Sequence, residues 1–342
     1  MDKTKLDKFK SLIDNANKIV IIQADNPDGD SLGSSIALEQ ILTNLGKDAY
    51  MYCSVDVPTY LRYIPAWSRV QKELPHDFDL GIIVDTSTMT LLENMDSMKM
   101  AQIKSKPSIM LDHHVSDATI DFTSLYINEG TVSTGELIFD IAKHLGYEMN
   151  MEAKEAIMTT ILSDSLGLTT PNVKSSAIRV VAELVDMGVS ISTLEDKRRE
   201  TYRKSLDLIH YKGRLLERIE TYLDNQLAMV TITYDEIIKF SPLYNPPMLI
   251  MEDMRLIEGN KIIVALKTYN DGRILGKVRS QNGCPIAEKL ASNFGGGGHD
   301  YSSGFKTYDY KDVNDLKREI ISKTNELLEE ERKKNEIIQY PN

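Results

Sequence analysis

The fold is decided by a turn between a buried strand and a helix, Asn26-Pro27-Asp28-Gly29-Asp30-Ser31-Leu32-Gly33-Ser34. The apolar run 19–22 precedes this turn, and a helical pattern over residues 32–45 follows it. In a parallel α/β sheet such a turn lies at the carboxyl end of the strand, where ligands bind. Asp28 and Asp30 would point the same way in extended backbone and repel each other unless a cation lay between them. On this stretch alone, a plain Pro-Asp-Gly turn with Asp30 or Ser31 as helix N-cap is equally favoured.

Apolar strands and amphipathic helices alternate through the first half of the chain. Further strands are expected at 49–53, 80–86 and 107–111, and helices at 5–16, 132–145, 151–163 and 174–187. This alternation predicts a parallel sheet with helices on both faces.

The second half follows a different pattern. It holds expected strands at 227–232, 262–266, 273–279 and 303–307, a hairpin turn at 270–272, and helices at 284–293 and 311–335. We therefore expect an α/β chain in three parts. A parallel-sheet domain would span residues 1–190, a charged helical linker 191–224, and a smaller mixed-sheet α/β domain 225–342.

The composition indicates a globular chain with an acidic balance. The 342 residues suffice for two domains, and 42% are hydrophobic and 27% charged. Two cysteines, Cys53 and Cys284, are too few for a disulfide framework, which favours a reducing cytoplasm. The sequence shows no secretory signal pattern and no apolar run long enough to span a membrane. The formal net charge of −11 argues against binding a long nucleic-acid duplex through a basic face.

Aspartates follow three of the expected apolar strands. They are Asp28 and Asp30 after the first, Asp85 after the strand at 80–86, and Asp112, followed by His113 and His114, after the strand at 107–111. The carboxyl ends of parallel strands lie along one edge of a sheet, so these side chains are expected to converge. A further aspartate, Asp164, ends a predicted helix. Carboxylates with one imidazole suit Mn²⁺ or Mg²⁺, and a pair of such ions activates a water for in-line displacement at phosphorus.

A second candidate site is the glycine run 295–298, which is followed by His299. Successive glycines let backbone N–H groups approach a phosphate closely, whereas the alternative is a plain flexible loop. Arg279, on a predicted hairpin strand, can hold a phosphate or a base edge through its guanidinium fork. Its alternative role is that of an ordinary surface arginine.

Together these motifs resemble those of the DHH-family phosphoesterases that carry a DHH-associated C-terminal domain. Residues 26–34 resemble the first motif of the family, Asp85 the second, 112–114 the third and Asp164 the fourth. The run 295–299 with Ser302-Ser303-Gly304 resembles the Gly-Gly-Gly-His…Ala-Ala-Gly signature of the associated domain, and Arg279-Ser280 falls at its Arg-Ser pair. The resemblance covers nearly the whole chain. It is nearest to the NrnA-like subgroup, which hydrolyses short RNA oligonucleotides, linear or cyclic dinucleotides, or the 3′-phosphate of pAp.

The resemblance implies a role for each matching residue. Metal ligation is implied for Asp28, Asp30, Asp85, His113 and Asp164. Of these, Asp85 would bridge two divalent cations, Asp28 would bind the first ion, and the other three would bind the second. The expected ions are Mn²⁺, with Mg²⁺ as the alternative. His114 would contact the scissile phosphate, and Asp112 would orient the histidines. Substrate contacts are implied for Arg279, Ser280, Gly296, Gly297, Gly298 and His299.

Two departures from the family pattern matter. The family usually has a histidine ligand of the first metal at the position of Ala24, for which Gln23, Asp25 or Asn26 could substitute. Asn26 is the favoured replacement, because it lies on the same side as position 24 in extended backbone. The stretch 165–172 lacks the aromatic-plus-arginine pattern that many NrnA-like relatives have after the fourth motif.

The expected function is hydrolysis of short RNA or DNA oligonucleotides or dinucleotides to mononucleotides by a metal-activated water. One alternative is a pAp 3′-phosphatase, and another is a nucleotide-binding protein that is catalytically weakened by Ala24. A pyrophosphatase-like activity is disfavoured, because the glycine-histidine region resembles the nucleotide-handling kind. Neither a long duplex nor a membrane is an expected partner. A homodimer is expected by analogy with the family, and the expected location is the cytoplasm.

Overall fold

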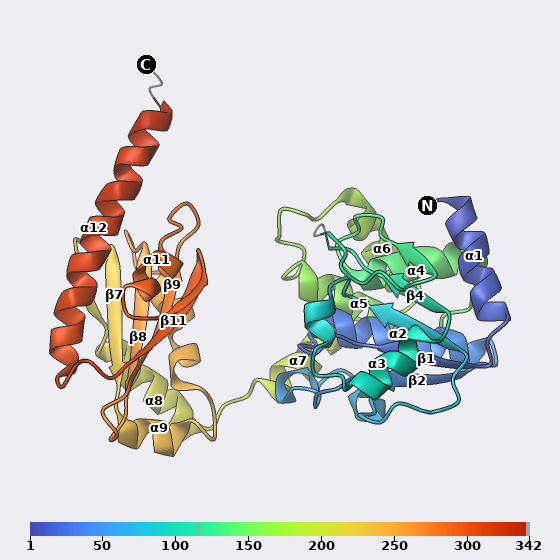
Figure 1. Cartoon of the computed structure of the whole chain (residues 1–342), viewed down its shortest axis with the longest axis horizontal. Coiled ribbons are helices and arrows are strands. Elements are labelled where there is room, and N and C mark those ends of the chain that lie inside the picture. The colour runs from blue at the N-terminus through green and yellow to red at the C-terminus, as the bar shows by residue number, and fades with distance from the viewer. Residues whose placement is uncertain (115–116, 340–342) are drawn as a thin grey trace. The chain divides into compact units, whose positions relative to one another are not determined.

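The structure is a computed structural model that describes residues 1–114 and 117–339, with side chains described to residue 334. The chain divides into two compact units, Met1–Arg203 and Lys204–Asn342 (Figure 1). The segment predicted as a linker, 191–224, holds two helices, α7 (Ile191–Thr201) and α8 (Leu206–Glu217). Leu194 of α7 belongs to the core of the first unit and Leu208 of α8 to a core of the second. Within the described residues, no helix is long and apolar enough to cross a membrane.

The first unit is built on a five-stranded parallel sheet, which confirms the predicted fold class. Its strands are β1 (Lys18–Ile22), β2 (Asp48–Tyr52), β3 (Leu80–Val84), β4 (Ser108–Leu111) and β5 (Leu125–Ile127). Their order in the sheet is β2-β1-β3-β4-β5, and every neighbouring pair is parallel. The short strand β5 lies outside the strands predicted from the sequence.

Both faces of this sheet are covered, but unequally. Ile19 and Ile21 of β1 pack into a large core with the helices α1 (Lys3–Asp14), α2 (Gly29–Asn44), α4 (Thr134–Leu145), α5 (Met151–Asp164) and α6 (Ser175–Asp186). Val20 and Ile22 point to the opposite face, where Ile103 of helix α3 (Ser97–Lys104) packs on them in a smaller core. A strand buried on both faces reads as a continuous apolar run, as residues 19–22 do.

Helix α2 begins earlier than the sequence predicted. It starts at Gly29 instead of residue 32, and its N-cap is Asp28, not Asp30 or Ser31. The Asp28 carboxylate accepts hydrogen bonds from the N–H groups of Asp30 and Ser31, both at 3.0 Å. The apolar periodicity misplaced the start, because the first turn of the helix carries small and polar residues.

The second unit contains a mixed six-stranded sheet in the order β10-β11-β9-β8-β7-β6. Its strands are β6 (Glu220–Tyr222), β7 (Leu227–Ile232), β8 (Ile262–Thr268), β9 (Ile274–Ser280), β10 (Gly297–His299) and β11 (Ser302–Thr307). Among these described strands, β7 and β8 pair in parallel and the other neighbouring pairs are antiparallel. The hairpin predicted around residues 270–272 is confirmed, since β8 and β9 flank it as antiparallel neighbours.

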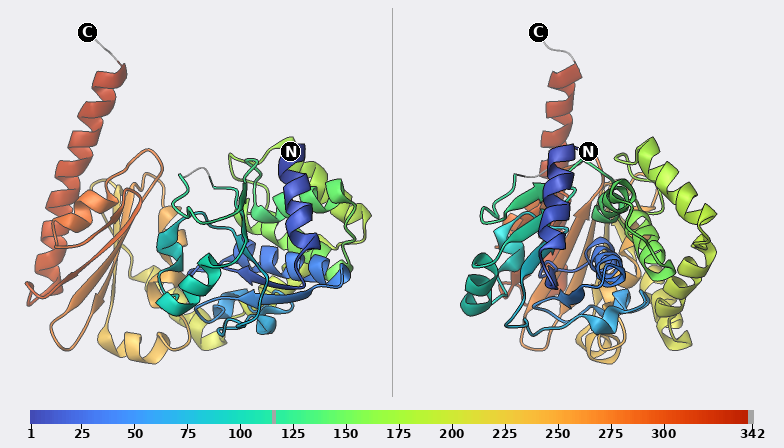
Figure 2. Two further views of the ribbon diagram at one scale, coloured as in Figure 1. Left: turned by 45° about the vertical axis from the view of Figure 1, so that its right-hand side comes forward. Right: turned by 90° about the vertical axis from the view of Figure 1, so that its right-hand side faces the viewer.

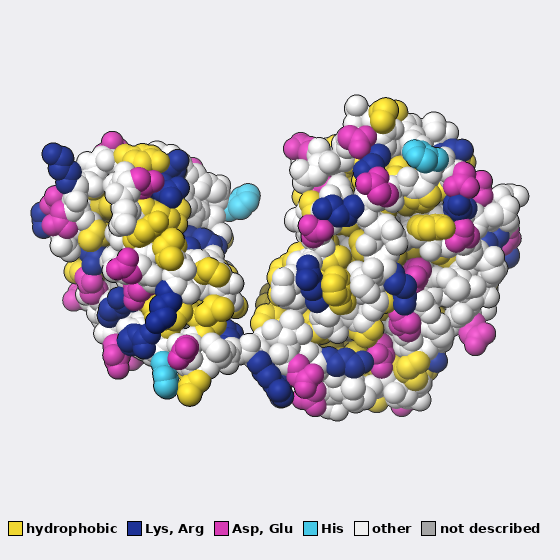
Figure 3. All heavy atoms as spheres, turned by 90° about the horizontal axis from the view of Figure 1, so that it is seen from below, with side chains coloured by type: hydrophobic (Ala, Val, Ile, Leu, Met, Phe, Trp, Pro, Cys, Tyr) yellow, Lys and Arg dark blue, Asp and Glu magenta, His cyan; other side chains and the backbone are white. Residues whose placement is uncertain are grey.

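Helices cover both faces of the second sheet. One core includes residues of α11 (Ala287–Ser292) and α12 (Val313–Gln339), the long terminal helix drawn in red in Figure 2. The other core includes residues of α8, α9 (Tyr234–Phe240) and α10 (Met251–Arg255). Figure 3 shows basic and acidic side chains interspersed over the surfaces of both units on the face that it presents.

Candidate metal centre

The predicted metal ligands follow three neighbouring strands of the first sheet. Asp30 comes after β1, Asp85 after β3, and His113 after β4. From β1 the chain first adds β2 on one side and then returns to add β3 on the other, so the strand order reverses between β1 and β3. Ligand sites in open α/β sheets form at the carboxyl ends of the strands where such a reversal occurs.

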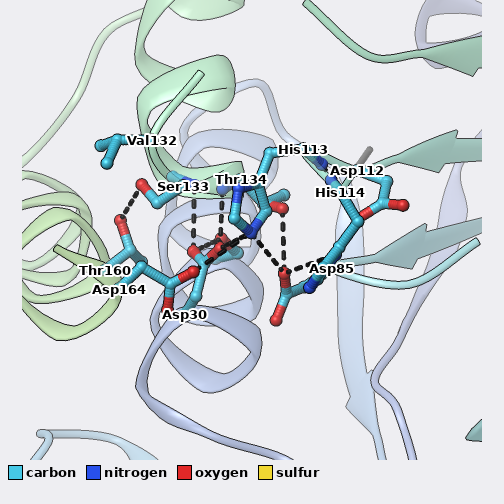
Figure 4. A network of polar contacts seen from close by, with 12 residues as sticks. Asp30, Asp85, Asp112, His113, His114, Val132, Ser133, Thr134, Thr160 and Asp164 are labelled. Carbon is cyan, nitrogen blue, oxygen red and sulfur yellow. Dashed lines mark hydrogen bonds and ion pairs between the residues drawn. The ribbon is translucent and has the colours of Figure 1, made fainter. Parts of the chain in front are cut away.

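The imidazole of His113 lies at the middle of the cluster (Figure 4). Its Nε2 atom is 3.1 Å from Asp164 Oδ2, 3.5 Å from Asp30 Oδ2 and 3.5 Å from Asp85 Oδ1. The His113 side chain is only 9% exposed, and Asp30 is completely buried. Four predicted ligands from four separate segments of the chain therefore meet around one nitrogen atom.

This arrangement fits a divalent cation. Ligand atoms at about 2.1 Å from an octahedral ion are about 3 Å from one another, close to the separations around His113 Nε2. Carboxylates this close and this buried repel each other unless positive charge lies among them. Two overlapping groups have potential ligand atoms within 4.8 Å of one another: Asp30, His113 and Asp164, and Asp85, His113 and His114. Carboxylate oxygens with imidazole are a donor set suited to a hard ion such as Mn²⁺ or Mg²⁺.

The carboxylate of Asp30 is held in place by the N-terminus of helix α4. It accepts hydrogen bonds from the N–H groups of Thr134 (2.7 Å) and Gly135 (3.2 Å), and from the Ser34 hydroxyl (3.0 Å). Thr134 also donates its hydroxyl to Asp85 Oδ1 at 3.2 Å. The free N–H groups of a helix N-terminus favour an anion. One short segment thus positions two of the predicted ligands.

Sequence reasoning missed Thr134 and Gly135. A signal was present, because Ser133 is followed three residues later by Glu136, a pattern typical of a helix N-terminus. The Ser133 hydroxyl indeed accepts a hydrogen bond from the N–H of Glu136 at 3.1 Å. The pattern indicates where the helix starts, but it does not indicate that this start faces Asp30.

Asp164 reaches the cluster because helices α2, α4 and α5 pack unusually closely. A Cβ atom built on Gly29 of α2 would lie 2.2 Å from the Ser163 hydroxyl oxygen, and one on Gly135 of α4 only 1.9 Å from that of Thr160. Any larger residue at these two positions would push α5 away. Figure 4 shows Thr160 and Asp164 together on this helix, facing the other ligands. The close approach therefore sets the position of Asp164.

Asp85 has a backbone conformation that is uncommon for a residue with a side chain. Its φ angle is 58°, in the left-handed region. Aspartate and asparagine tolerate this region better than most residues, and such conformations cluster at functional sites. The turn after β3 is thus bent sharply at the residue that carries the carboxylate.

Asp112 is directed at the two histidines that follow it. The Asp112 Oδ1 atom accepts a hydrogen bond from the N–H of His113 (2.9 Å) and lies 2.7 Å from His114 Nδ1. Burial acts to raise the pKa of Asp112, but the hydrogen bond from His114 and the charge of that ring lower it, and the net shift is downward. The bond to Asp112 in turn raises the pKa of His114. The His114 side chain is half exposed, so its ring is oriented from one side and open on the other.

Burial and mutual repulsion shift the pKa values of the clustered ligands. Burial, reinforced by the charge of Asp164, raises the pKa of Asp30 to about 6. Burial and the charge of Asp30 raise the pKa of Asp85 well above its usual range. Burial acts to lower the pKa of His113, but its bonds to Asp164 and Asp85 outweigh it and raise the pKa to about 11. Without a cation, the cluster therefore retains protons at neutral pH.

Asp28 stands apart from the other predicted ligands. It is exposed, caps helix α2, and belongs to neither of the two ligand groups found among the described residues. Its charge still raises the pKa values of both Asp30 and Asp85. It is therefore near the cluster, at its solvent side.

The residues that could replace a histidine ligand at position 24 differ in burial and in hydrogen-bond partners. Ala24 is buried, and Asp25 accepts hydrogen bonds from the Ser54 hydroxyl and the N–H of Asn94, so its carboxylate ties two loops together. Asn26, the favoured replacement, is exposed. Gln23 is completely buried, and neither its amide oxygen nor its amide nitrogen has a hydrogen-bond partner among the described atoms.

The predicted substrate residues lie in the second unit, on β9 and β10. In the sheet register Arg279 pairs with Ser302, and Ser302 pairs with His299. Residues directly opposite each other on neighbouring strands share a face, so these three side chains form one row. Ser280 is buried, and its hydroxyl donates to the backbone carbonyl of Asp300 (3.1 Å), away from that row.

The glycine run is split between a turn and an edge strand. Gly295 and Gly296 follow helix α11, while Gly297 and Gly298 begin β10, whose residues are exposed. β10 pairs only with β11, so its other edge is unpaired in the described sheet. The backbone of the predicted Gly296–Gly298 segment thus borders the row of Arg279 and His299.

Comparison with known families covers most of both units. Residues 18–166 match the DHH family, N-terminal domain, and residues 249–326 match the DHHA1 domain. The first match contains the three strands β1, β3 and β4 and the helices α2 and α5 that carry the clustered ligands. The second contains β8 to β11, and with them Arg279 and the glycine run.

Individual relatives are similar to this chain over more than four fifths of its length. The chain is 24% identical over 283 residues (82% of this chain, 81% of the relative) to the bifunctional oligoribonuclease and PAP phosphatase NrnA of Thermus thermophilus. It is 23% identical over 314 residues (91% and 95%) to the protein of the same name from Bacillus subtilis. A crystal structure of an exopolyphosphatase-related protein from Bacteroides fragilis has the same fold, with a TM-score of 0.76, 24% identity and 96% of each chain covered.

Proposed function

This chain is a DHH-family protein with a DHHA1 domain, and on that basis we propose that it hydrolyses phosphoester bonds in short oligonucleotides and dinucleotides, releasing mononucleotides. The observation that carries the proposal is the convergence of Asp30, Asp85 and Asp164 on the imidazole of His113. The two relatives named as oligoribonuclease and PAP phosphatase supply the class of substrate.

We assign two divalent cations to the first unit, Mn²⁺ in preference to Mg²⁺. Their proposed ligands are Asp28, Asp30, Asp85, His113 and Asp164. When bound, such ions neutralise phosphate charge and lower the pKa of a water, which makes it a nucleophile at neutral pH. We assign the catalytic role to residues 1–190, a connecting role to 191–224, and substrate binding to 225–342.

The residues around the ligands have separate tasks. Thr134 and Gly135 fix the carboxylate of Asp30, so that it does not reorganise when charge develops at the phosphate. Asp112 holds His114 by its Nδ1 atom, which leaves the Nε2 side of the ring free to donate a hydrogen bond to a phosphate oxygen. The raised pKa of His114 favours the protonated ring that such a donor needs.

In the second unit we assign the nucleotide to the row formed by Arg279, Ser302 and His299. The guanidinium of Arg279 is partly buried and, among the residues that the structure describes, donates one hydrogen bond, to the carbonyl of Val278 at 2.8 Å. Its remaining donors suit the planar fork geometry of a phosphate. Gly296, Gly297 and Gly298 add exposed backbone beside this row. Ser280 fits a supporting role, since it anchors the neighbouring turn.

Two other functions use the same residues. A pAp 3′-phosphatase is favoured by the second activity in the names of both relatives. A catalytically weakened nucleotide-binding protein is favoured by Ala24, because the first ion would lack an imidazole ligand. A long duplex is not a proposed substrate, given the net charge of −11. We propose a homodimer by family analogy, and a cytoplasmic location from the two free buried cysteines.

The deciding experiment offers pApA, a five-nucleotide RNA, pAp and pyrophosphate to the protein with Mn²⁺. Release of mononucleotides from pApA or the RNA is expected, and phosphate release from pAp alone would select the phosphatase. Asp85→Asn is the control, because asparagine tolerates the left-handed backbone at this position. No turnover of any of the four, together with intact metal and nucleotide binding, would contradict the proposal and favour the binding protein.

A further inference from the structure

A cavity of about 740 Å³ lies within the first unit beside the metal centre. Its lining includes Asp28 and Gly29, which directly precede Asp30, and Ser163, which directly precedes Asp164. The cavity therefore begins at the two segments that carry these ligands. Its volume falls within the range of about 300–1,000 Å³ that is usual for small-molecule sites.

The walls of this cavity are mostly aromatic and aliphatic. Tyrosine rings line it at positions 60, 63 and 202, and aliphatic side chains come from Leu61, Leu162, Leu166, Leu168, Ile191 and Leu194. The Tyr60 hydroxyl donates to the carbonyl of Pro27 at 3.4 Å, which ties this wall to the metal-binding turn. Flat rings and apolar side chains are the surfaces on which nucleobases stack, whatever their sequence.

One wall of the cavity is a strained loop. Leu166, Gly167 and Leu168 all have left-handed φ angles, of 48°, 73° and 71°. Leucine rarely adopts this conformation, and such strain persists mainly where it serves a ligand site. Leu166 is also 73% exposed, although it is a large apolar residue on the cavity lining. The loop thus holds an apolar side chain at the cavity mouth at a conformational cost.

The charges in the cavity do not favour a phosphate there. Of the described residues that line it, Arg198 is the one cation. Its guanidinium forms a two-pronged pair with Glu195, with distances of 2.7 Å and 2.8 Å, and Glu195 also lines the cavity. This pair leaves no net positive charge for an anion, but it offers donors and acceptors to the polar edge of a planar group. The lining therefore suits a neutral aromatic ring system with a polar edge.

We propose that this cavity binds a nucleobase of the nucleotide whose phosphate lies at the metal centre. The inference rests on the proposed function and names the part of the substrate that the first unit recognises. The base enters past Leu166, stacks on the tyrosine rings, and places its polar edge toward Arg198 and Glu195. Recognition of the base is then supplied by residues 60–63 and helix α7.

The test compares pApA with the same dinucleotide lacking the base at one position or the other. For the unaltered protein, removing the base from one of the two positions is expected to lower kcat/KM about tenfold, the effect of a lost stacking contact. Leu166→Asp is expected to lower kcat/KM for pApA about tenfold. For the abasic dinucleotide on which the unaltered protein is slowed, the variant is expected to have the same kcat/KM as the unaltered protein. Aspartate tolerates the left-handed backbone, and the site is exposed, so the variant is expected to fold.

The matched control is Met98→Asp, at an exposed apolar residue of α3 outside the cavity lining. It is expected to behave as the unaltered protein on all substrates. Equal rates of the unaltered protein on pApA and on both abasic substrates would overturn the inference. An equal loss in Leu166→Asp on base-bearing and abasic substrates would overturn it as well.

A binding experiment separates this inference from the proposed function. AMP and ribose 5-phosphate are titrated calorimetrically in the presence of Mn²⁺, with no turnover required. AMP is expected to bind at least about fivefold more tightly, and Leu166→Asp is expected to remove that difference. If the protein hydrolyses nothing but shows this pattern, the proposed function fails and the base site stands. Equal affinities for the two ligands in the unaltered protein overturn the base site.

Discussion

The sheet edges that carry the two halves of the proposed chemistry differ in burial. In the first unit, Asp30, Asp85 and His113 lie at the ends of neighbouring parallel strands and are almost fully enclosed, and Asp164 of α5, which joins them, is only 20% exposed. In the second unit, the row containing Arg279 and His299 crosses three antiparallel strands at an open edge. Closely grouped charges must be held by a rigid surround, whereas a surface that recognises a flexible substrate does not need one.

The difference predicts two kinds of response to substitution. Substitutions in the buried cluster of the first unit alter charges and side-chain positions that many surrounding residues hold in place. Their effects on the reaction rate should therefore be large. Changes in the second unit remove single contacts to the substrate, so their effects should be graded. Four experiments test this contrast.

The largest effect is expected for Asp85→Asn. The substitution keeps the side-chain shape and the tolerance for φ of 58°, but removes a negative charge from the predicted ion site. We expect kcat for dinucleotide hydrolysis to fall about a thousandfold or more, with an unchanged melting temperature. The measurement is mononucleotide release by chromatography, with a thermal melt in parallel. Retention of a tenth of the activity would show that Asp85 is not a ligand.

Gly135→Ala tests whether rigidity, not only charge, distinguishes the first unit. The new methyl group would lie 1.9 Å from the Thr160 hydroxyl oxygen, so α4 must shift and move the N–H that holds Asp30. We expect about 1–3 kcal/mol lower free energy of unfolding and about a hundredfold lower kcat. Chemical denaturation and steady-state kinetics measure the two effects.

The second change Thr160→Ala removes two of the three clashing atoms, Oγ1 and Cγ2, and leaves Cβ at 2.7 Å from the new methyl group, so it should restore part of both losses. Gly213→Ala on helix α8 is the control, since a Cβ atom built there meets no described atom of another part of the chain within 4 Å. It should be neutral or slightly stabilising. Equal behaviour of the two glycine variants would show that the close helix packing is unimportant.

Arg279→Ala tests the graded response expected of the second unit. Loss of a charged hydrogen-bond donor should raise KM about tenfold, while kcat stays within about twofold. Arg279→Lys should recover part of the loss, because it restores the charge without the fork. Arg318→Ala, at an exposed position on α12, is the control. A kcat loss as large as that of Asp85→Asn would erase the contrast between the two regions.

The fourth test is the pH dependence of metal binding. The pKa of Asp30 is raised to about 6 and that of His113 to about 11, so the ion-free cluster holds protons that a cation must displace. Raising the pH removes this competition. The apparent Mn²⁺ affinity should therefore increase between pH 6 and 8.5, by at most about tenfold per pH unit for each proton released.

Calorimetry in two buffers of different ionisation enthalpy measures the number of protons released. About one proton per ion is expected at pH 7, from His113. An affinity that does not change with pH would mean that the buried cluster is not the ion site.

The sequence named the residues of the buried aspartate–histidine cluster more readily than their surroundings. Asp30, Asp85, His113 and Asp164 could be named because each ends an apolar strand or a helix, a local pattern. Their supports could not be named in this way. Thr134 and Gly135 face Asp30 from more than 100 residues away, and only the packing of α4 against α2 brings them there.

Errors at the element ends had local causes. The start of α2 was placed three residues late, because its first turn is polar and small and so lacks apolar periodicity. Strand β5 was missed because it is only three residues long.

The sequence by itself determined the two-unit α/β class, the strand ends that carry aspartate and histidine, and the hairpin of β8 and β9. These follow from short-range patterns of apolar, turn-forming and charged residues. Tertiary structure alone decided that β1, β3 and β4 are neighbours, that α5 lies close enough to deliver Asp164, and that a cavity adjoins the site. Strand order, helix approach and cavities depend on contacts between residues far apart in the chain, and no local pattern encodes them.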